Sequence, residues 1–402
     1  MKQSLKECLE NAAKFLELFE FDAAEPLYHK VLRRHPDNAS ALMGVALLYN
    51  RTGKTAAALE VLKKIWQGIE NSPPERRNSI PPAVKARVLE QMGLAMQLQG
   101  NPDKAIALYS EANHVHASTQ LQLRISYLGN PALQAAVQVD MDKAQALVAA
   151  QDSTAAIEAY RRVLAVYPTH DRALHELGEL FRKRSDFQQA QPLIQQALVM
   201  QPMRAEYQNT LGLLFQQRCD YAKATLYFLR ALEIDPRNSV AQCNLGVAYK
   251  HLNRLNDAAL AYHRAIEMNP RMAEAYNNLG NLQRITGDFE AAKASLEQAI
   301  AIRPDYLDAT RNLESLLLRM EQISMQERSR KKPSVKKASP GSDADDPDAD
   351  ADAEAEKEVD ADPAVDAGPV SVPAAKAKPR VKAKAKPASA PAKKSKAAET
   401  AR

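Results

Sequence analysis

Few residues of this chain combine the types and the spacing that chemistry requires. Gly53-Lys54-Thr55 has the sequence that ends a phosphate-binding loop, but that loop needs a glycine where the chain has Leu48. His175 and Glu176 begin like a helical zinc motif, yet Glu179 stands where the second histidine would be needed. We therefore predict neither a nucleotide site nor a zinc site, and we interpret His175 as a surface histidine.

Two other groups of residues have the types, but not the pattern, of a metal site. His114 and His116 have no further ligands nearby in sequence, so we interpret them as surface histidines. Asp348, Asp350 and Asp352 resemble the first ligands of a calcium loop, but the glycine and the distal glutamate of that loop are missing. No set of nucleophile, base and acid stands out. The sequence thus predicts no enzyme activity, no cofactor and no metal.

The elements that must position any site are announced by a repeat. An alanine recurs at one place of a 34-residue frame, and the last five copies are evenly spaced. The eight positions are Ala24, Ala58, Ala105, Ala156, Ala190, Ala224, Ala258 and Ala292. A fixed period of this length is typical of a solenoid built from helix-turn-helix units. Each unit then buries its apolar faces against its neighbours.

Other positions keep the same register. A small residue precedes each alanine by twelve positions, as Gly246 precedes Ala258, and a large residue follows it one helical turn later, as Tyr262 does. The small residue lets the second helix of a unit approach the first closely. A proline such as Pro270 ends most units because it cannot continue the second helix. Asp220 and Asp288 stand in the turn between helices, where we expect them to act as N-caps.

These positions resemble the tetratricopeptide repeat (TPR) family, most closely at Tyr276-Asn-Asn-Leu279-Gly280, followed by Ala292, Leu296 and Pro304. The resemblance implies an all-α fold, a TPR solenoid that forms a right-handed superhelix of helix-turn-helix repeats. The repeats would be 5–38, 39–72, 86–119, 137–170, 171–204, 205–238, 239–272 and 273–306.

Departures from the repeat predict the domain organisation. The two Pro-Pro pairs near 73 and 81 predict a Pro-rich loop over 71–85, and Gly129-Asn130-Pro131 predicts a break. In order, we expect an N-terminal block over 5–119, a spacer over 120–136, a C-terminal block over 137–327 that ends in a capping helix over 307–327, and a disordered tail over 328–402. Whether the two blocks form one superhelix is left open.

In the TPR family, a partner lies along the inner side of the first helix of each repeat. Helical spacing places one stripe of this chain there, opposite the packing stripe. The predicted groove residues are Arg172, His175, Glu179, Arg182, Asn209, Asn244, Lys250, Asn277, Asn278, Asn281, Arg284 and Asn312.

Asn244, Asn278 and Asn312 form a column at one repeat position. Such a column over 171–306 resembles the TPR superhelix of the O-linked N-acetylglucosamine transferases, although no catalytic domain follows here. The resemblance implies that these amides hold the backbone of an extended peptide, since an amide both donates and accepts. The alternative is that polar residues are merely tolerated on an exposed face.

The tail alternates in charge, with a basic segment at 328–340, an acidic one at 341–368 and another basic one at 369–402. The last segment has the Lys-Ala-Pro composition of linker histones, which bind polyanions without reading sequence. Weak polyanion or nucleic-acid contact would involve Lys376, Lys378, Arg380, Lys382, Lys384 and Lys386. The alternative is a tail that only keeps the protein in solution.

The rest of the sequence bounds the compartment. The three cysteines do not form a Cys-x-x-Cys pair, the N-terminus lacks the apolar core of a signal peptide, and no stretch is long and apolar enough to span a bilayer. We expect a cytoplasmic protein.

The sequence as a whole predicts a non-enzymatic scaffold or adaptor that binds a protein or peptide in its groove. Two alternatives remain: an accessory subunit that recruits partners to a separately encoded enzyme such as a glycosyltransferase, and a nucleic-acid-associated protein that acts through its tail. The partner's identity and the oligomeric state cannot be predicted.

Overall fold

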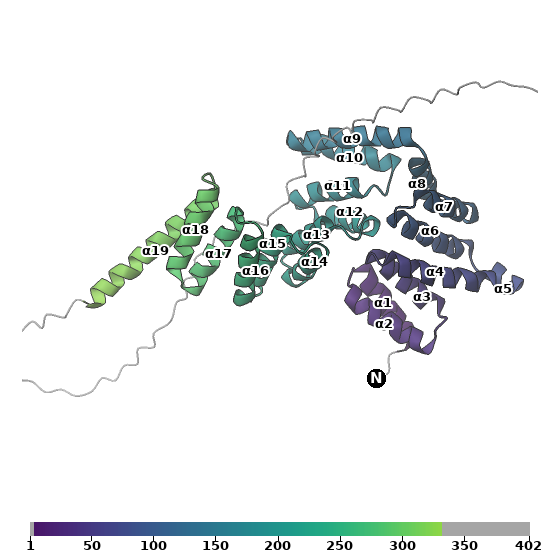
Figure 1. The fold of residues 1–402 in the computed structure, drawn as a ribbon, viewed down its shortest axis with the longest axis horizontal. Coiled ribbons are helices and arrows are strands. Elements are labelled where there is room, and N and C mark those ends of the chain that lie inside the picture. Colours follow the sequence, from purple (N-terminus) through teal and green to yellow (C-terminus); the bar gives the residue numbers. More distant parts are fainter. Residues whose placement is uncertain (1–3, 332–402) are drawn as a thin grey trace, which may run out of the picture. The chain divides into compact units, whose positions relative to one another are not determined.

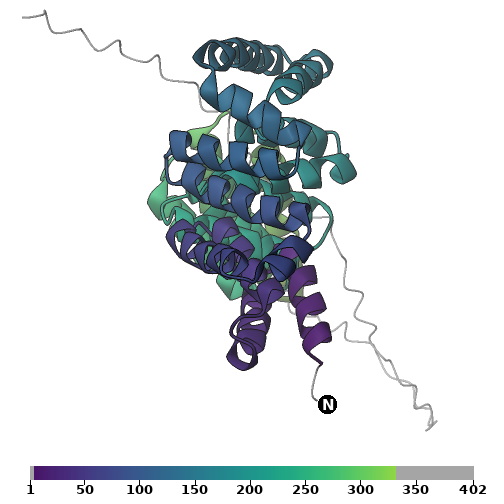
Figure 2. The ribbon, with the colours of Figure 1, turned by 90° about the vertical axis from the view of Figure 1, so that its right-hand side faces the viewer.

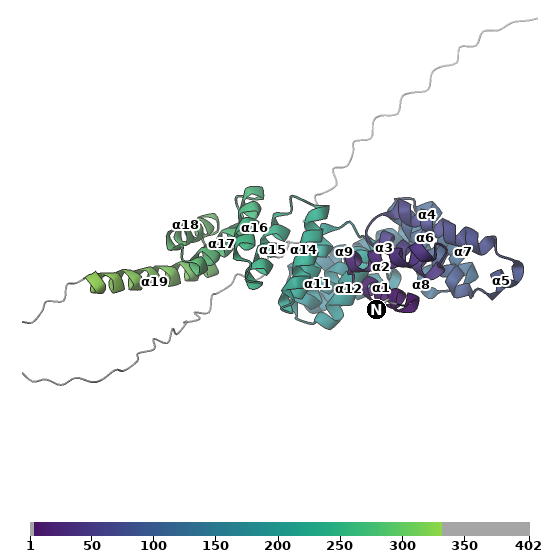
Figure 3. The same ribbon diagram turned by 90° about the horizontal axis from the view of Figure 1, so that it is seen from below.

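A computed structural model describes residues 4–331 of the chain, and all of its regular elements there are helices (Figure 1). Views from two further directions show the same coiled ribbons and, among these residues, no strand (Figure 2 and Figure 3). Consecutive helices lie against each other as pairs. The all-α repeat fold that the sequence predicts is therefore confirmed.

The helices alternate between the first and the second helix of a repeat, which we call A and B helices. The described helices are α1 (Leu5–Glu17), α2 (Phe21–Arg34), α3 (Ala39–Arg51), α4 (Thr55–Glu70), α5 (Pro74–Ser79), α6 (Pro82–Leu98), α7 (Pro102–Val115), α8 (Thr119–Gly129), α9 (Pro131–Ala149), α10 (Ser153–Val166), α11 (Asp171–Lys183), α12 (Phe187–Met200), α13 (Ala205–Gln217), α14 (Tyr221–Ile234), α15 (Ser239–His251), α16 (Leu255–Met268), α17 (Ala273–Thr286), α18 (Phe289–Ile302) and α19 (Leu307–Lys331).

Each pair is held by the small and large residues that the repeat predicts. The eight register alanines on the B helices have no exposed surface at all. Opposite them, the A helices use glycine where the B helix comes closest. A Cβ built on Gly246 would lie 2.6 Å from the ring of Tyr262, and one on Gly212 would lie 2.4 Å from the ring of Phe228. The glycine is thus needed because the large residue of the B helix occupies the place of its side chain.

The turns between A and B helices repeat as well. Each A helix is followed by one residue in the left-handed region, which is Gly287 before α18 and Cys219 before α14. An aspartate then caps the B helix, since Asp288 accepts from the Ala291 N–H and Asp220 from the Lys223 N–H. Both predicted N-caps are confirmed.

The Pro-rich segment corrects one prediction. Residues 71–85 were expected to form a loop, but they contain the short helix α5 and the beginning of α6. The second proline of each Pro-Pro pair, Pro74 and Pro82, is the first residue of its helix. A proline there loses nothing, because the first N–H groups of a helix have no partner within it. The first proline of each pair stays extended, as a residue before proline should.

Residues 120–136, expected to be a spacer, hold most of α8 and the beginning of α9. The two helices meet at Asn130, which has an extended backbone and whose side chain accepts from the N–H groups of Ala132 and Leu133. The predicted capping helix is present as α19, which continues to Lys331 and packs on α18 with Leu316 fully buried. The longer course of α19 is clear in Figure 3.

The first repeat contacts α14, more than 200 residues later in the chain. Arg230 of α14 donates to the carbonyl oxygen of Phe19 at 2.6 Å and forms an ion pair with Asp22 at 3.2 Å. The hydroxyl of Tyr227 donates to the carbonyl oxygen of Leu18 at 3.4 Å. Residues of both segments belong to one buried apolar cluster. Among residues 4–331, no helix is long and apolar enough to cross a membrane.

Candidate functional site

The candidate site is a row of polar side chains along the A helices α11, α13, α15, α17 and α19. In each step, the fifth residue of one repeat bonds to the sixth residue of the next, 35 positions later. The four pairs, which we call the amide ladder, are His175–Thr210, Asn209–Asn244, Cys243–Asn278 and Asn277–Asn312. The predicted asparagine column is therefore one half of a ladder between neighbouring repeats.

The geometry of the ladder is regular. Asn244 Nδ2 donates to Asn209 Oδ1 at 3.1 Å, and Asn312 Nδ2 donates to Asn277 Oδ1 at 2.9 Å. The Asn278 Nδ2 group lies 3.7 Å from the sulfur of Cys243, a weaker acceptor.

At the first step of the ladder, the rings and hydroxyl of three residues fix a tautomer. The hydroxyl of Thr210 donates to the Glu206 carbonyl oxygen at 3.0 Å, so it accepts from His175 Nε2–H at 2.9 Å. The imidazole of His175 also stacks on Tyr207, with ring centroids 4.4 Å apart.

The structure places the predicted groove residues in two groups. Four are half-buried along the edges of the row: Arg172, Glu179, Lys250 and Arg284. Eight are buried: His175, Arg182, Asn209, Asn244, Asn277, Asn278, Asn281 and Asn312. The interpretation of His175 as a surface histidine is wrong, because its ring is only 4% exposed. Sequence spacing placed these residues on one face, but it did not reveal that the neighbouring A helix covers them.

Several polar atoms of this row have no hydrogen-bond partner among the described residues. They are Gln208 Oε1, Gln216 Oε1, Asn277 Nδ2 and Asn278 Oδ1, all of them buried. Asn277 and Asn278 each use one polar atom for the ladder, and the other remains open. A buried polar atom without a partner costs about 1–3 kcal/mol. Sequence reasoning missed Gln208, which lies next to the ladder residue Asn209 and has no register signal of its own.

Charged groups concentrate at the α11 end of the row. Arg182 is 2% exposed and binds both carboxylate oxygens of Glu179 at 2.7 Å, and it donates to Gln217 Oε1 at 2.8 Å. Burial lowers the pKa of His175 to about 4, so the ring is neutral near pH 7. Burial, aided by the charge of Glu206, raises the pKa of Glu176 to about 7.

The other predicted sites are simply placed. The tail residues proposed for polyanion contact, from Lys376 to Lys386, lie outside the described residues, as do Asp348, Asp350 and Asp352. Within the part of the chain that the structure describes, no three His, Cys, Asp or Glu side chains come together in a way that could hold a metal ion.

Comparison with curated proteins gives one partial relative. The chain is 33% identical over 95 residues to the cellulose synthase operon protein C of Pseudomonas fluorescens (strain SBW25). The match covers 23% of this chain and only 7% of that protein.

Solved structures resemble parts of the chain. MamA shares 22% identity over 40% of this chain and 94% of its own, with a TM-score of 0.36. YrrB, a TPR protein with an unusual peptide-binding site, shares 21% identity over 43% of this chain and 89% of its own, with a TM-score of 0.35. PilW, a type IV pilus biogenesis factor, shares 19% identity over 50% of this chain and 96% of its own, with a TM-score of 0.43. TM-scores below 0.5 carry no argument about function.

Family models are decisive. Models described as tetratricopeptide repeat match residues 14–73, 141–184, 175–239, 239–272 and 273–306. These segments contain the register alanines, the close-packed glycines and the capped turns described above. The chain belongs to the tetratricopeptide repeat family.

Proposed function

We propose that the protein is an interaction scaffold, and that the polar face of its A helices from α11 to α19 binds the backbone of a partner segment. The observation that supports this most is the amide ladder with its open donor and acceptor atoms at Asn277 and Asn278. An extended peptide supplies an acceptor and a donor at every residue, so it matches such a row without a required sequence.

Packing alone gives no reason for the ladder. Neighbouring A helices of a solenoid need only apolar contacts, and replacing a buried polar network by well-packed apolar residues is often neutral or stabilising. Here the chain keeps polar residues at eight ladder positions and leaves several buried polar atoms open. The half-buried Arg172, Lys250 and Arg284 at the edges would add contacts to side chains of the partner.

The test begins with peptides selected from a random library on the full-length chain. Their dissociation constants are then measured for wild-type protein and for the triple variant Asn244→Ala, Asn278→Ala and Asn312→Ala. Losing about 1 kcal/mol for each amide predicts binding weakened by roughly a hundredfold. Because these amides also link neighbouring repeats, circular dichroism must show that the variant keeps its helices.

A matched control removes three polar groups from B helices instead, with His263→Ala, Glu267→Ala and Lys293→Ala. This variant should bind the selected peptides as the wild type does. Equal binding by the asparagine variant and the wild type would remove the ladder from the proposed function, and failure to select any peptide would count against a peptide-binding scaffold.

A further inference from the structure

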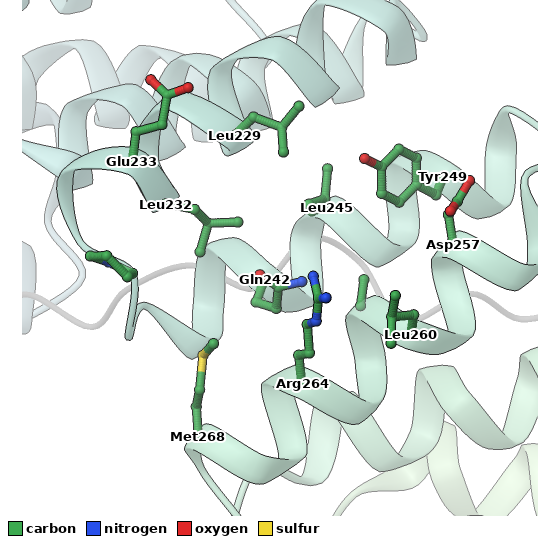
Figure 4. Close-up of a pocket in the computed structure, with 12 residues that line it drawn as sticks. Leu229, Leu232, Glu233, Gln242, Leu245, Tyr249, Asp257, Leu260, Arg264 and Met268 are labelled. Atoms are coloured by element: carbon green, nitrogen blue, oxygen red, sulfur yellow. The ribbon is translucent and has the colours of Figure 1, made fainter.

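A second surface of the molecule contains a pocket of about 540 Å³ between the B helices α14 and α16, above the A helix α15 (Figure 4). We call it the outer pocket. Leu229 and Leu232 line it from α14, Leu260 and Met268 from α16, and Gln242 from α15. None of the predicted groove residues lines it, so it is separate from the amide ladder.

The apolar lining of the outer pocket is not a requirement of the repeat. Leu229 is 40% exposed and Leu260 is 50% exposed. At the position of Leu229, the preceding repeat has Gln195 and the following repeat has His263. Exposed leucines gathered around one hollow, at a position that is polar in neighbouring repeats, indicate a binding surface better than a packing need does.

One cation lies in this apolar surrounding. The guanidinium of Arg264 points toward Gln242 and Leu245 in Figure 4. Among the described residues, no carboxylate forms an ion pair with it, and the nearby Asp257 is instead held by Arg254 at 2.7 Å. An occupant of the pocket would therefore gain from presenting a carboxylate next to an apolar side chain.

The chain itself shows what such a surface binds. The residues that occupy the same repeat positions one repeat earlier, 34 residues before, are Arg230 for Arg264, Tyr227 for Ala261 and Phe215 for Tyr249. Those earlier positions are filled, because there the B helix α14 contacts the first repeat. The outer pocket is thus the unfilled counterpart of an intramolecular interface.

The contacts at the filled interface define the chemistry. Arg230 donates to the Phe19 carbonyl oxygen at 2.6 Å, pairs with the Asp22 carboxylate at 3.2 Å, and lies 4.9 Å over the ring of Phe21. Its ligand is therefore a turn that presents an aromatic ring directly followed by a carboxylate. Arg264 can make the same three contacts, since its position on α16 matches that of Arg230 on α14.

We propose that the outer pocket binds a segment of a partner protein in which an aromatic side chain is followed by an acidic residue, with Arg264 pairing with the carboxylate. Ala261 stands where the filled interface has Tyr227, and this smaller residue leaves the space that the partner's aromatic ring enters. Leu229, Leu260 and Met268 pack around that ring.

The probe is a fluorescent synthetic peptide with the sequence of residues 16–25 of this chain, which includes Phe21 and Asp22. Fluorescence anisotropy measures its binding to the full-length protein. We expect saturable binding below about 1 mM, weakened roughly tenfold or more by Arg264→Glu and by Leu260→Glu. Both residues are exposed, so circular dichroism should show unchanged helicity.

Three controls complete the experiment. Arg319→Glu makes the same charge change at an exposed position of α19 and should leave binding unchanged. A peptide with Phe21→Ala and Asp22→Asn should not bind. Binding that is lost in Arg230→Ala but kept in Arg264→Glu would mean that the peptide only displaces the first repeat, and it would overturn the proposal. Absence of binding to the wild type would overturn it as well.

Discussion

At the scale of single residues, His175 and Glu176 show how one buried position can oppose its neighbour. Burial lowers the pKa of His175 from 6.5 to about 4, so the unfolded chain binds a proton more readily than the folded one between these values. Stability from this group is therefore lost as the pH falls from 6.5 toward 4. Glu176 has its pKa raised from 4.5 to about 7, and its contribution is lost as the pH rises through that range.

We predict that His175→Gln flattens the acid side of the stability profile. The glutamine cannot be protonated, whereas the buried imidazole opposes folding by up to about 3 kcal/mol when the pH falls to 4. The measurement is the midpoint of urea unfolding, followed by circular dichroism, between pH 7 and pH 4. His114→Gln at an exposed position should leave the slope of the wild type. Parallel slopes for wild type and His175→Gln would contradict the buried neutral ring.

At the scale of elements, the closeness of A and B helices depends on a glycine facing a large side chain. Tyr262 has no exposed surface and is enclosed by α15 and its own neighbours, so its ring cannot move aside easily. Gly68, inside α4, lies on the opposite kind of surface, because nothing is within 4 Å of a Cβ added there.

These two glycines predict opposite effects of the same substitution. Gly246→Ala should destabilise the pair α15–α16 by about 1–3 kcal/mol, since the new methyl overlaps the Tyr262 ring. Gly68→Ala should be neutral or stabilise by up to about 1 kcal/mol, because alanine favours the helix and meets no neighbour. Thermal unfolding of both variants checks this. A loss of stability in Gly68→Ala, or none in Gly246→Ala, would contradict the packing described.

At the scale of the whole molecule, the first repeat depends on α14 as well as on its sequence neighbours. Phe19 has a φ of 60°, which is uncommon for a bulky residue. Its ring is buried below the guanidinium of Arg51, and its carbonyl oxygen is bound by Arg230. The strained turn is thus held by two arginines, one of them from a distant repeat.

We predict that Arg230→Ala loosens the first repeat by about 2–3 kcal/mol, the combined worth of a charged hydrogen bond and a cation–π contact. Hydrogen exchange followed by mass spectrometry should show faster exchange over α1 and α2. Exchange over α17 and α18 should stay as in the wild type, and Arg319→Glu should change neither region. Unchanged exchange in α1 and α2 would mean that α14 does not stabilise them.

Much of this protein is determined by its sequence alone. The register alanines, the glycines before them and the capping aspartates fix the helix pairs, because each acts on residues within one repeat or on the next one. The face on which Asn244, Asn278 and Asn312 lie follows from helical spacing for the same reason. The Pro-Pro pairs were misinterpreted because a proline marks both the end of extended chain and the start of a helix.

Tertiary structure decided the rest. Burial of His175, the pairing of each asparagine with the preceding repeat, and the grip of Arg230 on Phe19 depend on how helices approach one another across repeats. Arg230 and Arg264 stand at the same repeat position and look alike in sequence. Only the folded chain shows that one is occupied by the first repeat while the other faces an open pocket, because that difference arises from contacts between segments about 200 residues apart.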